Sequence, residues 1–195
     1  MRQAGGNQGK ANLILDNLIA VRKAVPMLVV MDNGYATKSG TSSSQASAFE
    51  EVLLQEVIPM IDAKFRTLPC RESRAIAGLS MGANQTMRIA INHPEAFAYY
   101  GGFSGTANYP YTEPLDAATF LEGKVKDGEA VNRQFNVFFL GLGTSEPRPF
   151  PGVVRAFRQM MDKQGIEYTY YESPETAHEW LTWRRALYQY AQLLF

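Results

Sequence analysis

The sequence predicts an α/β fold, in which a mostly parallel sheet is flanked by helices. Short apolar segments of strand character alternate along the chain with longer segments of helical apolar spacing, and this alternation is typical of parallel sheets. Hydrophobic residues make up 46% of the 195 residues and charged residues 19%, which is enough apolar material for a sizeable core. At about 150 residues per domain, the length predicts a single domain over 1–195.

The first part of the chain is expected to form two helices and a strand. Apolar residues spaced from Leu13 to Val21 predict a helix over 11–23. The wholly apolar run MLVVM at 27–31, which ends in Asp-Asn-Gly, is typical of a buried parallel strand that leads into a loop. An apolar face over 49–61, preceded by serines that can cap it, predicts the second helix.

The rest of the chain continues the alternation. Strands are predicted at 75–78, 98–103, 135–141 and 166–171, and helices at 83–92, 153–161 and 180–194. Residues 106–134 interrupt this pattern with mixed Pro, Tyr, Gly and charged residues. We interpret them as an insertion over one end of the sheet, the end at which the candidate active site described below would lie.

Charge and cysteine content exclude several classes of protein. Nineteen Lys and Arg balance nineteen Asp and Glu, so no strong net field attracts nucleic acid or an anionic membrane. The longest apolar runs are far shorter than the about 20 residues that span a bilayer. The single cysteine, Cys70, cannot form an internal disulfide, and with two histidines it cannot build a Cys/His zinc site. We therefore expect no nucleic-acid or membrane partner, no metal and no cofactor.

A serine nucleophile is predicted from the sequence GLSMG at 78–82. This G-x-S-x-G pattern lies between a predicted strand and a predicted helix. Its small residues allow a strained strand-to-helix turn that lifts the hydroxyl of Ser80 above the sheet edge. The alternative is an ordinary tight turn with a solvent-facing serine.

The base that such a serine needs is normally a histidine, and the chain has two. His93 lies beside Pro94 at a predicted helix end, where a capping or surface role is the better interpretation. His178 lies in SPETAHEW, a loop after a strand and before the last helix. A parallel sheet would deliver a base to its carboxyl edge from that loop, so His178 is the predicted base; a surface histidine at a helix start is the alternative.

The acid is less constrained by the sequence. Glu146 follows the most strand-like segment, in FFLGLGTSEP, and is our first choice, although a surface-loop role is the alternative. Glu172 follows the next strand and is the second choice. Glu175 and Glu179 are more often solvated loop charges.

The order Ser80, Glu146, His178 is the order expected for an α/β-hydrolase. The stretch IAGLSMGANQTMRIAINHPEAFAYYGGFSG closely resembles the feruloyl and acetyl-xylan esterases of carbohydrate esterase family 1, within the esterase-D-like α/β-hydrolases. GKANLILDNLIA, MLVVMDNGYA, FFLGLGTSEP and YYESPETAHEWLTWRR also resemble that family, so the likeness covers nearly the whole chain. It implies ester hydrolysis through an acyl-serine, no metal, and acylated plant polysaccharide or oligosaccharide substrates.

The chain departs from this family in two respects. The family often has Asp where this chain has Glu146. It also has strands and an H-G-x-G-type oxyanion loop before the part that matches GKANLILDN, so we expect an N-terminally truncated hydrolase fold. The oxyanion hole would keep the backbone N–H of Met81 and lose its usual second donor, which Gly5 and Gly6 could partly replace.

Two functional hypotheses follow. The first is a serine carboxylesterase, in which the aromatic residues Tyr35, Trp180 and Trp183 could form a platform for a ferulate or a sugar. The two tryptophans also fit the core stripe of the last helix, and that is the better interpretation of them. The second hypothesis is a weakly active or non-catalytic remnant that serves binding or assembly.

Two further expectations concern the whole protein. The resemblance implies secreted or periplasmic parent proteins, although MRQAGGNQGK shows no signal-peptide core. Loss of the family's first strands would leave 27–31 near a sheet edge, so we also expect a homo-oligomer.

Overall fold

The computed structural model describes residues 8–36, 47–107 and 114–195. Four parallel strands form one sheet in the order β1-β2-β3-β4: β1 (Ala75–Leu79), β2 (Tyr99–Phe103), β3 (Val137–Gly143) and β4 (Thr169–Ser173). The helices are α2 (Ala11–Ala20), α3 (Ser47–Val52), α4 (Ile58–Lys64), α5 (Met81–Asn92), α6 (Gly128–Gln134), α7 (Phe150–Gln164) and α8 (Trp180–Ala191). The predicted α/β fold with a parallel sheet is therefore confirmed.

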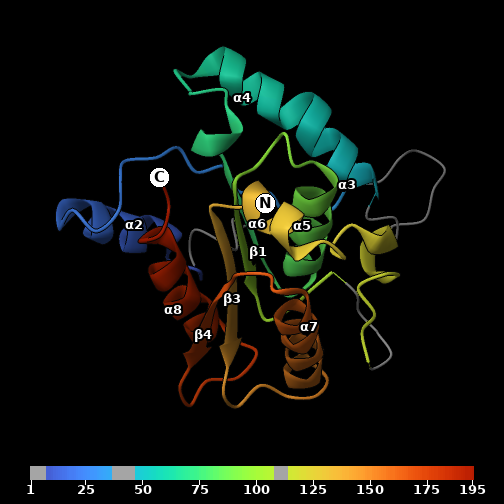
Figure 1. Cartoon of the computed structure of the whole chain (residues 1–195). Coiled ribbons are helices and arrows are strands. Elements are labelled where there is room, and N and C mark those ends of the chain that lie inside the picture. Colours follow the sequence, from blue (N-terminus) through green and yellow to red (C-terminus); the bar gives the residue numbers. More distant parts are fainter. Residues whose placement is uncertain (1–7, 37–46, 108–113) are drawn as a thin grey trace.

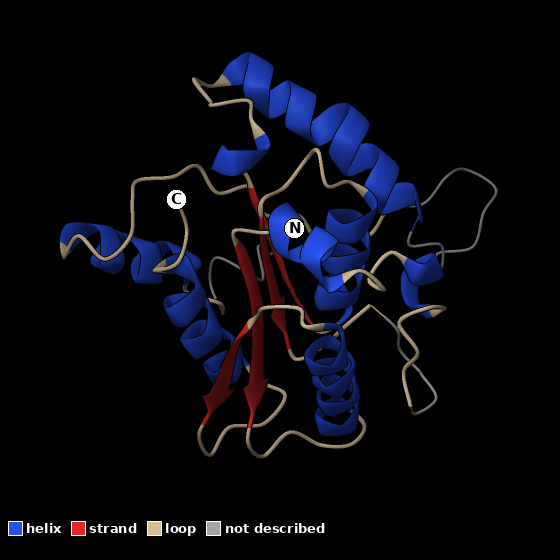
Figure 2. Ribbon diagram, in the orientation of Figure 1, coloured by secondary structure: helices blue, strands red, loops and turns tan. Residues whose placement is uncertain are grey.

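Helices cover both faces of the sheet. In Figure 1, α5, α6 and α7 lie on one side of the strands and α8 and α2 on the other, and Figure 2 shows the strands enclosed between these two helical layers. The two layers exist because successive side chains of a strand point to opposite faces. Tyr100 and Phe138 belong to the larger core cluster under α5 and α7, whereas their neighbours Tyr99 and Phe139 pack against α8. A third, smaller cluster joins α2 to α8.

The helix predicted over 49–61 forms, but in three successive segments. A single π-helical segment, η1 (Leu53–Val57), connects α3 to α4. Two short 3-10 turns, η2 (Arg71–Ser73) and η3 (Phe120–Gly123), complete the secondary structure of the described residues.

The prediction of a strand at 27–31 is wrong. The chain is irregular from residue 25 to residue 36, and the described part of the sheet begins at β1. Leu28 is 56% exposed and Met31 54% exposed. A strand needs a neighbouring strand for its backbone hydrogen bonds, and apolar composition alone does not supply one.

The segment 106–134 lies partly outside the described residues, since 108–113 are not described. Its described part holds η3 and α6 and buries Phe120, Val125 and Val131 in the larger core cluster. Our interpretation of this segment as an insertion stays a prediction.

All strands of the sheet run in the same direction, so their carboxyl ends share one edge. In Figure 1 this edge lies at the lower end of β3 and β4. The loops that leave β1, β3 and β4 at this edge carry Ser80, Glu146 and His178. The fold therefore brings three residues that are far apart in the sequence to one edge, where ligands of open α/β sheets gather.

Candidate active site

Ser80 occupies a sharp turn between β1 and α5. Its backbone has φ 52° and ψ −116°, a combination that L-residues other than glycine rarely adopt. Its N–H donates to the carbonyl of Phe103 at 2.8 Å, which ties the turn to β2. Strain held in place by surrounding contacts is common at functional sites.

Glycines make this turn possible. A Cβ on Gly78 would collide with the backbone carbonyl of Gly82, because the strand and the helix start close together. A Cβ on Gly105, in the loop after β2, would lie 2.7 Å from the carbonyl oxygen of Ser80. At Gly82 the corresponding Cβ would meet nothing within 4 Å. The first glycine of the G-x-S-x-G pattern is thus required by packing, and the second is not.

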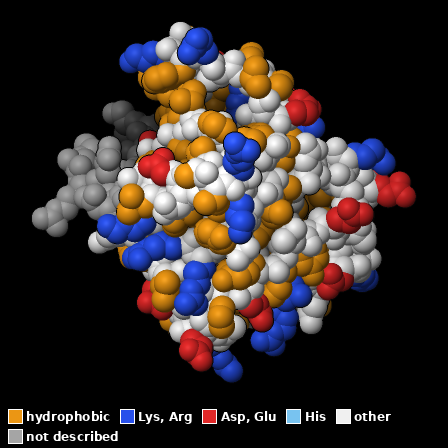
Figure 3. Space-filling view, turned by 90° about the vertical axis from the view of Figure 1, so that its left-hand side faces the viewer, with side chains coloured by type: hydrophobic (Ala, Val, Ile, Leu, Met, Phe, Trp, Pro, Cys, Tyr) orange, Lys and Arg blue, Asp and Glu red, His pale blue; other side chains and the backbone are white. Residues whose placement is uncertain are grey.

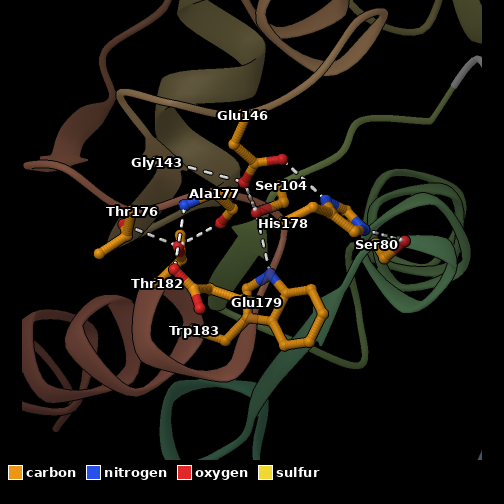
Figure 4. A network of polar contacts seen from close by, with 10 residues as sticks. All are labelled: Ser80, Ser104, Gly143, Glu146, Thr176, Ala177, His178, Glu179, Thr182 and Trp183. Carbon is orange, nitrogen blue, oxygen red and sulfur yellow. Dashed lines mark hydrogen bonds and ion pairs between the residues drawn. The ribbon is translucent and has the colours of Figure 1, made fainter.

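Ser80, His178 and Glu146 form a continuous line of hydrogen bonds (Figure 4). The Nε2 atom of His178 lies 2.9 Å from Ser80 Oγ, and its Nδ1 atom lies 2.7 Å from Glu146 Oε2. The Glu146 side chain is fully buried, whereas that of His178 is 21% exposed. A carboxylate only accepts, so a neutral imidazole here carries its proton on Nδ1 and leaves Nε2 to accept from the serine hydroxyl.

The buried carboxylate of Glu146 has donors on both of its oxygens. Oε2 receives the Nδ1 proton of His178, and Oε1 receives the hydroxyl of Ser104 and, at 3.4 Å, the N–H of Gly143. Hydrogen bonds of this kind offset much of the cost of burying a charge.

Aromatic rings surround the imidazole of His178. The ring of Phe150 stacks on it at a centroid distance of 3.9 Å and an angle of 16°. Trp183 meets it edge-on at 5.1 Å, and Trp180 meets Trp183 edge-on at 5.2 Å. These contacts limit the rotation of the imidazole and shield it from water.

The loop that carries His178 is anchored to the start of α8. Thr182, which is fully buried, lies 2.7 Å from Thr176 Oγ1 and bonds the carbonyl of Ala177 (Figure 4). The N–H of Ser145 donates to the carbonyl of Thr176, so the acid loop and the histidine loop are also joined.

The backbone N–H of Met81 stands at the first position of α5. Among the described residues this N–H has no hydrogen-bond partner, and it lies at the positive end of a 12-residue helix. It is therefore available to bind an oxyanion formed beside Ser80. Gly5 and Gly6, expected from the sequence as a partial second donor, lie outside the described residues.

The buried side chain of Tyr100 is hydrogen-bonded to the first turn of α5. Tyr100 donates to the carbonyl of Ala83 at 3.3 Å, and a Cβ on Gly102 would occupy the place of its hydroxyl. Burial raises the pKa of Tyr100 well above that of a free tyrosine, so its hydroxyl stays protonated.

The remaining predicted residues lie outside this line of hydrogen bonds. Tyr35 is 71% exposed and, within the described chain, makes no hydrogen bond or ring contact to Ser80, His178 or Glu146. Glu172 accepts from the hydroxyl of Tyr170, at 2.8 Å. Other side chains considered from the sequence bond elsewhere: His93 between Glu50 and Glu95, and Glu179 to the N–H of Ala177.

Ser104 and Phe150 were not predicted from the sequence. Ser104 directly follows β2, so its place at the carboxyl edge was a usable signal. Phe150 begins α7 after a proline-rich turn, and nothing in the local pattern points to a contact with a histidine 28 residues later in the chain.

In the described ranges, no group of three or more His, Cys, Asp or Glu side chains is arranged to hold a metal ion. No helix in the same ranges is long and apolar enough to cross a membrane.

Comparisons with known proteins agree with this architecture. The chain is 39% identical to the endo-1,4-beta-xylanase/feruloyl esterase of Xylanibacter ruminicola over 191 residues, which are 96% of this chain. The same match covers 24% of that protein, so the chain spans about a quarter of the length of this curated relative.

Solved structures share the fold. One is a variant of the feruloyl esterase module of Clostridium thermocellum complexed with sinapinate, with a TM-score of 0.79 and 21% identity over 99% of this chain and 72% of that chain. Another is the CE1 ferulic acid esterase of Anaeromyces mucronatus, with a TM-score of 0.74 and 20% identity over 91% of this chain and 68% of that one. The model of the Esterase family matches residues 7–194. Since that match spans nearly the whole α/β-hydrolase fold described above, the chain belongs to the Esterase family.

Proposed function

We propose that the chain is a serine carboxylesterase that hydrolyses acyl esters of plant cell-wall polysaccharides, either feruloyl or acetyl, through an acyl-serine intermediate. The observation that carries the proposal is the line of hydrogen bonds from Ser80 through His178 to the buried Glu146. Such a line activates a hydroxyl that is otherwise a weak nucleophile.

In the first half of the reaction, Ser80 Oγ attacks the ester carbonyl carbon while His178 Nε2 takes the hydroxyl proton. Glu146 accepts a hydrogen bond from the Nδ1–H of His178, with 2.7 Å between Nδ1 and Oε2, and stabilises the imidazolium that forms. His178 then gives the proton to the leaving sugar oxygen, the ester C–O bond breaks, and the acyl group remains on Ser80.

The negative charge that develops on the carbonyl oxygen needs a donor aimed at it. The N–H of Met81 at the start of α5, which has no hydrogen-bond partner among the described residues, is suited to this role. The positive end of the helix adds to it. A single oxyanion donor is worth about 10²–10³ in rate in other hydrolases.

In the second half, water replaces the sugar. His178 Nε2 accepts a proton from a water molecule, whose oxygen attacks the acyl carbon. The bond to Ser80 Oγ breaks, His178 returns the proton to it, and the free acid leaves. No metal or cofactor takes part in these steps.

The substrate class rests on likeness and on the surroundings of His178. The relative from Xylanibacter ruminicola and the two solved structures carry feruloyl or ferulic acid esterase in their names. Trp183 and Trp180 lie in edge-on contact next to the imidazole, where an aromatic acyl group or a sugar ring could pack.

The test is hydrolysis of methyl ferulate, acetylated xylan and p-nitrophenyl acetate by the wild type and by Ser80→Ala. We expect Ser80→Ala to lower kcat at least about a thousand-fold and to leave thermal stability nearly unchanged. Ser73→Ala, in η2 before the start of β1 and away from the carboxyl edge, is the matched control and should keep full activity. A wild type with no serine-dependent turnover would favour the non-catalytic hypothesis instead.

A further inference from the structure

We propose that Ser104 is a positioning residue, whose hydroxyl holds the carboxylate of Glu146 in the orientation that serves His178. Trp183 fixes the direction of that hydroxyl. This inference rests on the proposed function, because Glu146 is the group assigned there to orient the base.

Ser104 follows the last residue of β2, and its burial and backbone conformation restrict its side chain to one orientation. It is fully buried, and its N–H donates to the carbonyl of Gly141 on β3 at 2.8 Å. Its backbone φ is +58°, in the left-handed region that disfavours side chains. A buried residue held in this conformation between two strands has little freedom to move.

The hydroxyl proton of Ser104 has a determined direction. The indole Nε1–H of Trp183 lies 2.9 Å from Ser104 Oγ, and an indole nitrogen only donates. Oγ therefore accepts from Trp183 and is left to donate its own proton to Glu146 Oε1 (Figure 4). The resulting chain runs from Trp183 through Ser104, Glu146 and His178 to Ser80.

Because of this hydrogen bond, the two carboxylate oxygens of Glu146 have different partners. Oε1 is occupied by Ser104 and, more weakly at 3.4 Å, by the N–H of Gly143, whereas Oε2 faces His178 Nδ1 at 2.7 Å. Without the Ser104 hydroxyl, Oε1 keeps only the long contact. The carboxylate can then rotate, and His178 loses part of its orientation.

The second contact of Trp183 makes the same chain restrict the imidazole. Its ring meets His178 edge-on at 5.1 Å while its N–H is bound by Ser104. Ser104 thus acts on the base by two routes, through the carboxylate and through the indole.

The first test is Ser104→Gly, because glycine adopts the positive φ without strain and removes only the hydroxymethyl group. We expect kcat on methyl ferulate or p-nitrophenyl acetate to fall about 10- to 100-fold, with KM within about two-fold. Thr106→Val is the matched control, because this buried hydroxyl two residues further along has no hydrogen-bond partner among the described residues. It should leave kcat unchanged. An unchanged kcat in Ser104→Gly would overturn the proposal.

A second measurement separates positioning from general damage and needs no turnover. The chain has only two histidines, so few imidazole N–H protons contribute to the ¹H NMR spectrum, and His93→Gln assigns them. In the wild type the Nδ1 proton of His178 lies in a short hydrogen bond to Glu146, with 2.7 Å between Nδ1 and Oε2, and should give a downfield signal. In Ser104→Gly the carboxylate can rotate, so this signal should move upfield or broaden, whereas Thr106→Val should leave it unchanged. An unchanged Nδ1 proton signal in folded Ser104→Gly would contradict the proposal, even if activity fell.

A third variant tests the role of Trp183. Trp183→Phe keeps a ring beside His178 and removes the N–H that binds Ser104. We expect it to lower kcat several-fold in the wild type and to have no further effect in Ser104→Gly, because the N–H acts through the hydroxyl. Additive losses would mean that Trp183 acts independently of Ser104. If the wild type hydrolyses no ester, the proposed function fails, while the NMR signal of the His178 Nδ1 proton still decides on Ser104.

Discussion

At the scale of single residues, the turn around Ser80 separates two glycines that look equivalent in the sequence. A Cβ at Gly78 collides with the backbone of Gly82, whereas a Cβ at Gly82 meets open space. We therefore expect Gly78→Ala to destabilise the protein by about 1–3 kcal/mol through overpacking. Gly82→Ala should be neutral or stabilise it by up to about 1 kcal/mol, since it lies in a helix. Thermal unfolding of both variants measures the difference; equal losses would contradict it.

The assignment of the acid can be tested by a matched pair of residues. Glu146→Gln should lower kcat by about 10²–10⁴, because an amide neither fixes the histidine tautomer nor stabilises the imidazolium. Glu172→Gln should change it little, since that side chain bonds the hydroxyl of Tyr170 and not His178. Steady-state kinetics on one ester substrate suffices. Greater damage from the Glu172 variant would reverse the assignment.

The candidate residues that the structure brings together are those with a local signal in the sequence. Ser80 lies in a short motif between a strand and a helix, and His178 and Glu146 each follow a predicted strand. Ser104 and Phe150 gain their contacts only when distant segments meet, at separations of 42 and 28 residues along the chain. Tertiary partners of this kind leave no periodic trace in a single sequence.

At the scale of elements, the four strands and the helices α5, α7 and α8 follow the predicted pattern within a few residues at their ends, whereas α6 was not predicted. Most of them bury an apolar face, and apolar periodicity along a segment indicates such burial. The segment 27–31 has the same composition but remains exposed and irregular. Composition shows which segments are apolar. Strand formation also needs a neighbouring strand for the backbone hydrogen bonds, and composition does not show whether one is present.

The buried hydroxyl of Thr182 helps to anchor the loop between β4 and α8. Thr182→Val keeps the volume but removes the bonds to Thr176 and to the carbonyl of Ala177. We expect a loss of about 1–3 kcal/mol in the free energy of unfolding and a several-fold fall in kcat, because His178 follows directly. Urea unfolding and kinetics on the same preparation measure both. Normal kcat with lowered stability would show that the loop keeps its geometry without this anchor.

At the scale of the whole molecule, two buried tyrosines contribute to a loss of stability in alkali. Burial raises the pKa of Tyr100 and of Tyr190 well above that of a free tyrosine. Above about pH 10 the unfolded chain releases these protons and the folded chain keeps them, so stability falls as pH rises, by about 1.4 kcal/mol per pH unit for each group. Tyr100→Phe should remove one such contribution. Urea unfolding between pH 9 and pH 11 gives the slope, and equal slopes for variant and wild type would refute this expectation.

The exposed apolar segment also bears on how the whole molecule behaves in solution. Ala24 and Met27 pack against the cluster of α2 and α8, and the side chains that follow are about half exposed: Leu28 56%, Val29 48%, Val30 50% and Met31 54%. Figure 3 shows further hydrophobic side chains on the face that carries α2 and α8. Contiguous apolar surface of this kind usually marks an interface.

We therefore expect the protein to self-associate through this segment, most simply as a dimer with a two-fold axis, because a second copy would cover the same apolar residues on both chains. Sedimentation velocity at micromolar concentration should give about twice the formula mass for the wild type. Val29→Asp combined with Met31→Asp should shift the protein to the monomer, since two buried charges at an interface are costly. Leu181→Asp, an exposed apolar residue in the first turn of α8, is the control and should leave the mass unchanged. A wild type that sediments as a stable monomer at this concentration would show that water, and not a second copy, covers residues 28–31.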